Sequence, residues 1–288
     1  MTGPLNIALT FDDYFWAPAY ATMRSVALTT RRRTDLVFHL FHWRLSNEHV
    51  RDLDAIGEEF GATIRHYRLD ADPEISRLIA GLPATKSFPP VVYARLLLDQ
   101  LLPAEVSRVL YLDSDLYVRA PVEKLLELDL GGMSLAAAPE PGRHHLVAGD
   151  DMRTRKGPFD IADPYFNSGV LVIDRAAWGR ADLPGFLAEL QKSGELARLY
   201  HDQDVLNLKF RGQWLALDPR WNFTKPHPAA RALDPFIVHY TTGMKPWNAL
   251  AYVAFGSSYK HVMTRNVVRR YARYRRGVWL KRLVGRKG

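Results

Sequence analysis

Short apolar runs rich in β-branched and aromatic residues alternate along this chain with longer stretches of helical period. The pattern predicts a strand at residues 6–11, a helix at 17–30, a strand at 36–41, a helix at 47–60 and a strand at about 63–67. Parallel strands need crossover connections, usually helices, so this order predicts an α/β fold with a Rossmann-like, mostly parallel sheet. A βαβαβ opening is typical of nucleotide-binding folds.

The rest of the chain continues the pattern less regularly. Residues 82–90 contain three prolines and predict a loop, after which a helix is expected at 91–102. Residues 139–164 are rich in Gly, Pro and charge, and are expected to form a mobile loop over a site. Further strands are predicted at residues 106–112, 134–138, 166–173, 214–217 and 236–239.

Composition limits the kinds of site that this fold can carry. The 288 residues are 47% hydrophobic, enough for a sizeable core. The absence of cysteine excludes disulfides, thiolate metal sites and a cysteine nucleophile, so a metal needs carboxylate, imidazole or backbone oxygen ligands. The chain shows no signal-peptide pattern and no window with the ~18 apolar residues of a membrane span, so a cytoplasmic, non-integral protein is expected.

Two acids separated by one residue follow the strand expected at 106–112. In extended backbone, residues i and i+2 point to the same face, so Asp113 and Asp115 are expected to converge on one hard cation. A cation there would bridge phosphate oxygens. The alternative interpretation of the same triplet is a solvated turn at the end of a strand.

A second cluster of polar residues follows the short apolar strand expected at 236–239. His239 would complete a site of mixed carboxylate and imidazole ligands, which suits Mn²⁺ better than Mg²⁺. Lys245 would neutralise a diphosphate, and Gly243 would let the backbone approach it. An isolated histidine at a strand end is more often a structural, hydrogen-bonded residue, but the nearby lysine and the acid pair favour a ligand.

Six motifs that occur in order along residues 5–250 resemble those of glycosyltransferase family 8. They are residues 9–13 (LTFDD), 93–96 (YARL), 110–115 (LYLDSD), 165–170 (YFNSGV), 202–207 (DQDVLN) and 239–247 (HYTTGMKPW). The chain is similar to the bacterial galactosyl- and glucosyltransferases of that family, including lipooligosaccharide galactosyltransferases, and resembles glycogenin more distantly.

The resemblance implies a GT-A fold that binds a UDP-sugar and Mn²⁺, with Mg²⁺ as an alternative. It implies transfer of a hexose, galactose or glucose, with retention of anomeric configuration. The implied acceptor is a saccharide or glycolipid, such as a lipopolysaccharide or lipooligosaccharide core or another cell-envelope glycan.

The resemblance also assigns roles to individual residues. They are metal ligation by Asp113, Asp115 and His239; donor contacts by Thr10, Asp12, Tyr14, Arg95, Asp113, Ser114, Asp115, Asn167, Gly243 and Lys245; and catalysis by Asp202 and Gln203. Gln203 matches the residue usually proposed at the β-face of the anomeric carbon, whereas Asp202 is the better nucleophile on chemical grounds. Front-face attack and a covalent intermediate therefore both stay open.

Several of these positions have structural alternatives or depart from the family pattern. Asp12 and Asp202 would also serve as helix caps. Thr242 stands where a glycine is usual, and Tyr14 stands where a small polar residue often lies near the ribose. Glu140 is a weaker match for an acid near the donor or acceptor sugar.

The C-terminal residues 265–288 carry the basic character of the chain. They contain ten Lys or Arg and no acid, so removing them from the overall +8 leaves −2. Val267, Tyr271, Tyr274 and Val278 recur at near-helical spacing, which predicts an amphipathic helix for an anionic membrane surface. The predicted organisation is a GT-A catalytic domain at 1–260 and a basic membrane-association segment at 261–288, which would attach the protein peripherally to the cytoplasmic face.

Two other classes of function fit parts of the sequence. A metal-dependent phosphatase of the haloacid dehalogenase type also places Asp-x-Asp after a strand, but after its first strand and with threonine where this chain has Tyr117. A non-catalytic protein that binds nucleic acid or membrane through the basic tail is the second alternative. The near-complete set of site residues argues against it, so no nucleic-acid partner is expected.

Overall fold

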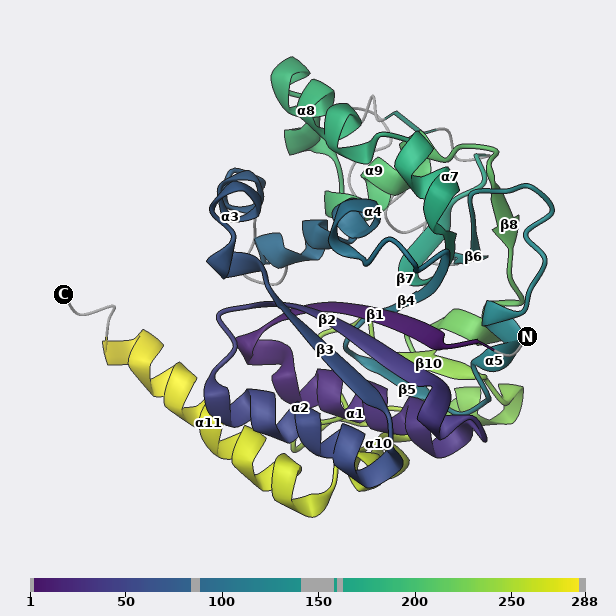
Figure 1. The fold of residues 1–288 in the computed structure, drawn as a ribbon. Coiled ribbons are helices and arrows are strands. Elements are labelled where there is room, and N and C mark those ends of the chain that lie inside the picture. Colours follow the sequence, from purple (N-terminus) through teal and green to yellow (C-terminus); the bar gives the residue numbers. More distant parts are fainter. Residues whose placement is uncertain (1–2, 84–88, 141–157, 160–162, 285–288) are drawn as a thin grey trace.

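The computed structural model describes residues 3–83, 89–140, 158–159 and 163–284 of the chain. A seven-stranded sheet in the order β3-β2-β1-β4-β7-β6-β8 lies between two layers of helices (Figure 1). Its strands are β1 (Leu5–Asp12), β2 (Leu36–Trp43), β3 (Thr63–Arg68), β4 (Arg108–Leu112), β6 (Leu135–Pro139), β7 (Phe166–Asp174) and β8 (Trp214–Ala216). The predicted α/β fold is confirmed.

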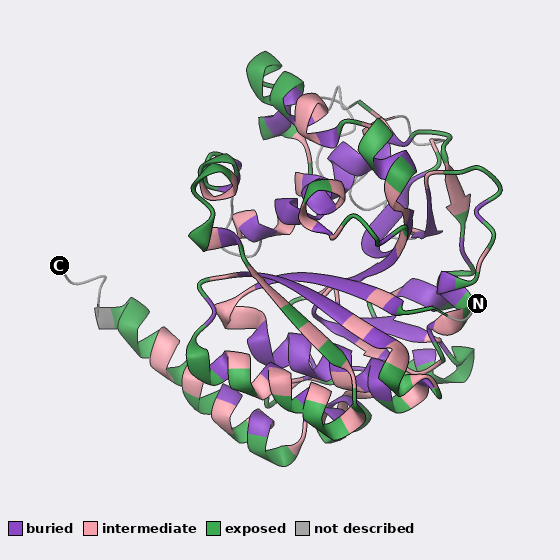
Figure 2. Cartoon of the chain, viewed as in Figure 1, coloured by how far each residue is buried: buried purple, intermediate pink, exposed green. Residues whose placement is uncertain are grey.

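Helices cover both faces of the sheet, with a buried core under each layer (Figures 1 and 2). One layer contains α1 (Trp16–Thr29), α2 (Asn47–Phe60), α10 (Gly256–Val262) and α11 (Arg265–Val284). The other contains α3 (Pro73–Ala80), α4 (Leu98–Leu101), α7 (Arg175–Arg180), α8 (Leu183–Ser193) and α9 (His201–Lys209). The short α5 (Glu123–Leu126) follows the strand β5 (Leu116–Val118). Local signals set helix ends: α2 begins at the Ser46 cap and ends at Gly61, whose φ is 72°.

Strand direction explains how the polar motifs meet. Strands β1, β2, β3 and β4 are parallel, as predicted, but β7 runs antiparallel to both β4 and β6. The start of β7 therefore lies at the carboxyl end of β4. Leu112 pairs with Val170, and the Asp113 N–H donates to the Gly169 carbonyl at 2.8 Å.

The strand predicted at 236–239 lies in a second, smaller sheet. This sheet has the order β5-β10-β9, with β5 (Leu116–Val118), β10 (Ile237–His239) and β9 (Phe223–Thr224). His239 pairs with Leu116 across the antiparallel β5–β10 ladder. The ladder thus brings the histidine beside Asp115, although the two residues are far apart in sequence.

The helix predicted at 91–102 is a 3₁₀ helix over most of its length. This segment, η4 (Pro90–Leu97), leads into the single turn of α4. Side chains three residues apart eclipse in a 3₁₀ helix, which places Val92 and Arg95 on the same side. Both line the cavity described below.

The C-terminal helix α11 packs against the body along its first half. Val267 and Tyr271 belong to the core, and the Tyr271 hydroxyl donates to the Tyr14 carbonyl at 3.0 Å. These two side chains are therefore not available to a membrane, contrary to the pattern-based assignment. The second half is more exposed (Figure 2), and none of the described helices is long and apolar enough to cross a membrane.

Candidate active site

A cavity of about 440 Å³ opens where β1, β4 and β10 end and where β7 and α9 begin. Such crevices at the carboxyl ends of strands are the usual ligand sites of open α/β sheets. All but one of the predicted site residues line it, together with Thr242 and Glu140. The lining residues predicted from the sequence are Thr10, Asp12, Arg95, Asp113, Ser114, Asp115, Asn167, Asp202, Gln203, His239, Gly243 and Lys245.

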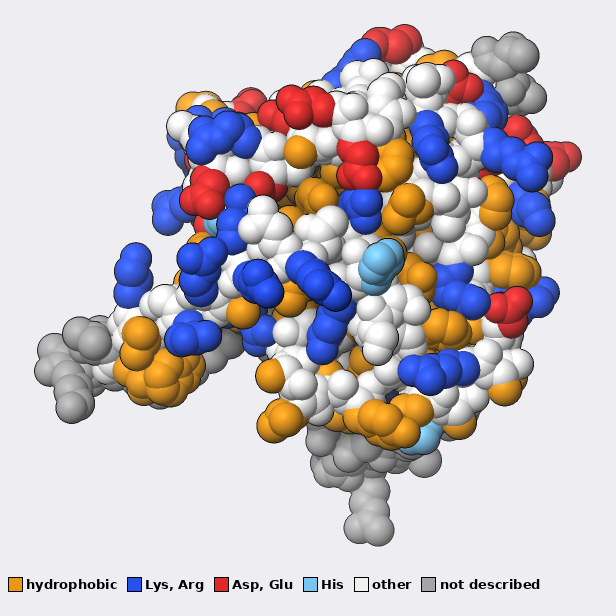
Figure 3. All heavy atoms as spheres, turned by 90° about the horizontal axis from the view of Figure 1, so that it is seen from below, with side chains coloured by type: hydrophobic (Ala, Val, Ile, Leu, Met, Phe, Trp, Pro, Cys, Tyr) orange, Lys and Arg blue, Asp and Glu red, His pale blue; other side chains and the backbone are white. Residues whose placement is uncertain are grey.

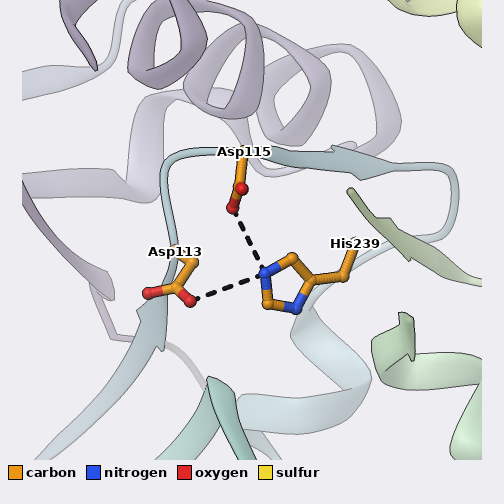
Figure 4. A group of neighbouring side chains, drawn as sticks. All are labelled: Asp113, Asp115 and His239. Atoms are coloured by element: carbon orange, nitrogen blue, oxygen red, sulfur yellow. Dashed lines mark ion pairs between the residues drawn. The ribbon is translucent and has the colours of Figure 1, made fainter. Parts of the chain in front are cut away.

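Asp113, Asp115 and His239 converge on one side of the cavity, with one ligand atom of each within 4.8 Å of the others (Figure 4). His239 Nε2 lies 3.2 Å from Asp115 Oδ1 and 3.5 Å from Asp113 Oδ2. The acids converge through a turn at Ser114 and Asp115 and not through extended backbone, so the geometric reason predicted for their convergence was wrong.

The donor set of this cluster fits a divalent cation. Oxygen and imidazole nitrogen ligands suit Mn²⁺, and the side-chain carboxylates would offset its charge. Gly169 leaves the room that the cluster needs, because a Cβ there would lie 2.3 Å from His239 Cε1 and 2.9 Å from Asp113 Oδ2. Asp113, Asp115 and His239 are therefore the residues that would hold the ion.

Lys245 contacts the same cluster from the loop after β10. Its Nζ lies 2.5 Å from Asp115 Oδ2 and also donates to the Tyr240 carbonyl. Burial alone would raise the pKa of Asp115, but Lys245 and His239 beside it hold that pKa well below its usual range. The carboxylate is therefore ionised and ready to bind a cation. A Cβ at Gly243 would meet nothing within 4 Å, so the protein atoms around this position leave room for a side chain.

Arg95 joins Asp113 to Asp202, the predicted catalytic acid. Its guanidinium lies 2.9 Å from Asp113 Oδ1 and 3.0 Å from Asp202 Oδ2, and it donates to the Ser168 carbonyl at 2.9 Å. Burial raises the pKa of Asp202 to about 6, although Arg95 opposes the shift. Asp202 lies in the first turn of α9 and is buried in this network, so it is not the cap of that helix.

The end of β1 forms the opposite wall of the cavity. Asp12 caps the short 3₁₀ turn η1 (Asp13–Phe15) by accepting from Tyr14 N–H at 3.0 Å and Phe15 N–H at 3.2 Å. Its pKa is raised by burial. Thr10 Oγ1 lies 2.8 Å from the Tyr111 hydroxyl. Asp12 thus lines the cavity as predicted, and it caps the turn before α1 and not α1 itself, whose N-cap is Phe15.

Tyr14 is the predicted site residue that does not line the cavity within the described chain. Its hydroxyl accepts from Arg275 Nε at 3.2 Å, and its ring lies 6.3 Å from those of Tyr271 and Tyr274. It therefore contacts α11, so the structure does not bring it to the other donor-binding candidates.

Polar side chains from β7 and α9 line the part of the cavity next to Asp113, Asp115 and His239. Gln203 Oε1 accepts from Ser168 N–H at 3.1 Å, and its Nε2 donates to the Tyr165 hydroxyl at 3.3 Å. Asn167 Nδ2 donates to Glu140 Oε2 at 2.7 Å, so the acid that matched only weakly in the sequence does lie beside this group. The rest of the loop predicted at 139–164 lies largely outside the described residues.

Sequence reasoning missed several residues of the site. Asn222, just before the two-residue strand β9, accepts from His239 Nδ1 at 2.8 Å. Lys225, which follows the same strand, lines the cavity. A strand of two residues has no detectable period, so the pattern gave no reason to place either beside the site. Phe15, Ser168, Tyr200 and His201 also line it.

Comparison with known proteins identifies the family of the chain. The profile of glycosyl transferase family 8 matches residues 6–251. The chain is 27% identical to lipopolysaccharide 1,2-glucosyltransferase of Escherichia coli K12, covering 86% of this chain and 74% of that protein. It is 29% identical to general stress protein A of Bacillus subtilis, covering 90% and 93% respectively.

Solved structures show the same fold. The crystal structure of an active-site mutant of LgtC aligns with a TM-score of 0.76 and 25% identity, over 90% of this chain and 95% of that one. The galactosyltransferase LgtC in complex with donor and acceptor sugar analogues aligns with a TM-score of 0.75 over the same shares.

Fold and site together define a glycosyltransferase with the GT-A architecture, in which a Rossmann-like sheet meets an acidic cluster at its strand ends. Within that class the chain belongs to glycosyl transferase family 8. The family predicted from the six motifs is confirmed.

Proposed function

We propose that this enzyme transfers a hexose, galactose or glucose, from a UDP-sugar to a saccharide or glycolipid acceptor with retention of anomeric configuration. The observation that carries the proposal is the convergence of Asp113, Asp115, His239 and Lys245 on one cavity that also contains Asn167 and the α9 side chains. Relatives named lipopolysaccharide 1,2-glucosyltransferase and lipopolysaccharide 1,3-galactosyltransferase support a lipopolysaccharide core or another envelope glycan as the acceptor.

The roles of the residues follow from their places in the cavity. Thr10, Asp12 and Ser114, at the ends of β1 and β4, would contact the nucleotide, as is usual for strand ends in such sheets. A bound Mn²⁺ or Mg²⁺ at the acidic cluster would neutralise the charge that develops on the departing diphosphate. Lys245 lies where it would neutralise the same charge, which stabilises the transition state more than the ground state.

Transfer breaks the bond between the anomeric carbon and the diphosphate oxygen and forms a bond from the acceptor oxygen on the same face, and the acceptor proton passes to the departing diphosphate. Arg95 and the Ser168 hydroxyl hold Asp202 at 3.0 and 3.3 Å. Both contacts reach Oδ2, and the carboxylate so positioned would stabilise the positive charge of the oxocarbenium-like sugar. Gln203 would present its amide to the sugar from the adjacent position on α9.

The test is Mn²⁺-dependent release of UDP from a panel of UDP-sugars without acceptor. Wild type is compared with Asp113→Ala and with a control, Asp35→Ala. Asp35 is a surface acid that pairs only with Arg32 in the described structure. Turnover of one donor that is lost in Asp113→Ala and retained in Asp35→Ala supports the proposal and identifies the sugar. No binding or turnover of any UDP-sugar contradicts it.

We further propose that the second half of α11 attaches the enzyme to the anionic cytoplasmic face of a membrane. Trp279, Leu280 and Leu283 are 59%, 50% and 43% exposed. Figure 3 shows hydrophobic side chains gathered among Lys and Arg at the far end of this helix. Interfacial aromatic and aliphatic side chains flanked by basic ones suit anionic headgroups, at about 1 kcal/mol per basic residue.

Vesicle flotation tests this attachment. The full chain is compared with a variant carrying Trp279→Ser, Leu280→Ser and Leu283→Ser, which leaves the packed half of the helix intact. The wild type is expected to float with vesicles containing phosphatidylglycerol and the variant to stay at the bottom of the gradient. Equal flotation of the two proteins contradicts the attachment.

A further inference from the structure

A buried network of side-chain amides connects β7 to the imidazole of His239, one of the three candidate metal ligands. Gly169 N–H donates to Asn167 Oδ1 at 2.9 Å. A backbone N–H is a donor only, so the side-chain atom that it meets is the carbonyl oxygen of Asn167. The other end of that amide, Nδ2, faces Glu140 Oε2 at 2.7 Å, where a donor is required. The orientation of Asn167 is thus fixed from both sides.

Asn222 continues the network, and its orientation follows from that of Asn167. A donor is needed opposite Asn167 Oδ1, so the atom of Asn222 that lies 2.8 Å away is Nδ2. Asn222 Oδ1 is then the atom 2.8 Å from His239 Nδ1, which must carry the hydrogen. Nε2 is consequently the ring nitrogen that faces Asp113 and Asp115, where a bound cation would meet it.

The surroundings keep this arrangement in place. Asn222 is 2% exposed, His239 3% and Asn167 6%, so water has little access to replace any of the bonds. The imidazole also lies against the backbone of Gly169, where a side chain would overlap it. The ring therefore has one tautomer and one orientation in which every buried amide is satisfied.

We infer that Asn222 is a positioning residue for the metal site. It selects the His239 tautomer whose Nε2 is free to ligate, and it links that ligand to Asn167 in the sugar-lining part of the cavity. A hydrogen-bond acceptor on the outer nitrogen of a ligating histidine fixes its orientation and raises its basicity, and its loss typically weakens metal affinity by about 10–100-fold. The inference rests on the proposed function, because it assumes that a divalent metal binds at this cluster.

Two substitutions separate the two bonds of Asn222. Asn222→Ala removes both. Asn222→Asp keeps an acceptor for His239 Nδ1 but places a carboxylate oxygen against Asn167 Oδ1. The matched control is Asn207→Ala, because Asn207 is an equally buried amide that bonds to Phe166 and Gln203 backbone and not to the metal cluster.

The primary measurement is the Mn²⁺ dissociation constant without donor, from the electron paramagnetic resonance signal of free Mn²⁺. UDP release and the unfolding temperature in EDTA are measured alongside. Asn222→Ala is expected to weaken Mn²⁺ binding by about tenfold or more. Asn222→Asp is expected to bind Mn²⁺ as wild type does but to show a several-fold higher donor KM. Asn207→Ala is expected to lower the unfolding temperature and leave Mn²⁺ affinity unchanged.

The outcomes distinguish this inference from the proposed function. If wild type binds no Mn²⁺, both the proposed metal site and the proposed role of Asn222 are contradicted. If wild type binds Mn²⁺ and Asn222→Ala binds it equally well, only the positioning role is overturned. If Asn222→Asp loses as much affinity as Asn222→Ala, tautomer selection is overturned.

Discussion

Gly169→Ala tests whether Asp113 and His239, which come from different sheets, need the space that this glycine leaves. A Cβ at position 169 would lie 2.3 Å from His239 Cε1 and 2.9 Å from Asp113 Oδ2, whereas ordinary contacts begin at 3.4 Å. Asn222 holds the imidazole, and Arg95 holds Asp113 at 2.9 Å, so neither ligand is free to turn aside. One ligand must therefore move by about 1 Å, a displacement that costs on the order of 100-fold in rate when it falls in a catalytic site.

The assay combines Mn²⁺ binding, UDP release and urea unfolding. We expect turnover about 100-fold below wild type. We expect overpacking to lower the free energy of unfolding by about 1–3 kcal/mol. The control is Gly179→Ala in α7, where the nearest atom would be Asp99 Oδ2 at 3.6 Å and a helical alanine adds up to about 1 kcal/mol of stability. If Gly169→Ala has the same turnover and the same Mn²⁺ affinity as wild type, the steric argument is refuted.

Three further predictions follow from buried groups. Arg95→Lys leaves at least one of its two carboxylate partners, the partly exposed Asp113 or the buried Asp202, unpaired. We therefore expect the free energy of unfolding in urea to fall by about 3 kcal/mol and UDP release to fall; an unchanged unfolding midpoint contradicts this. Burial lowers the pKa of His39 and His42 to about 4, so their contribution to stability is complete above pH 6.5 and is lost as pH falls towards 4. Urea titrations should show about 2 kcal/mol less stability at pH 5.5 than at pH 7.5, and His39→Gln with His42→Gln should flatten that slope. Tyr271→Ala should cost about 3–5 kcal/mol of unfolding free energy if α11 is part of the core, whereas a loss below 1 kcal/mol would show that the helix is dispensable.

The regular part of the fold could be predicted because its signals are local. In the first βαβαβ unit, β1 and β2 are long and mostly buried. The amphipathic helix α2 has a clear cap at each end and spans the residues predicted for it. The direction of β7 was not readable, because a strand buried on both faces has the same apolar pattern in either direction. The small sheet was missed because β5 and β9 have only three and two residues.

The site could be predicted in part for the same reason. Asp113 and Asp115 follow the apolar strand β4, and His239 is the last residue of β10, so the sequence placed all three at strand ends. The six motifs assigned the family. The positions of Tyr14 and Asn222 depend instead on how α11 and β9 pack, which is a tertiary property. Local pattern carries no information about such contacts, so the structure was needed to separate a cavity residue from a helix contact.

The packing of α11 ties the last part of the chain to the first. Tyr274 donates to Asp13 at 2.9 Å, and Tyr271 meets the turn that follows β1, although more than 250 residues separate the two ends of these contacts. During translation, the wall of the cavity formed by η1 therefore lacks this support until α11 has been synthesised. A product truncated before α11 would retain every residue proposed to hold the metal or the donor and still have an incomplete core, so it is expected to be inactive.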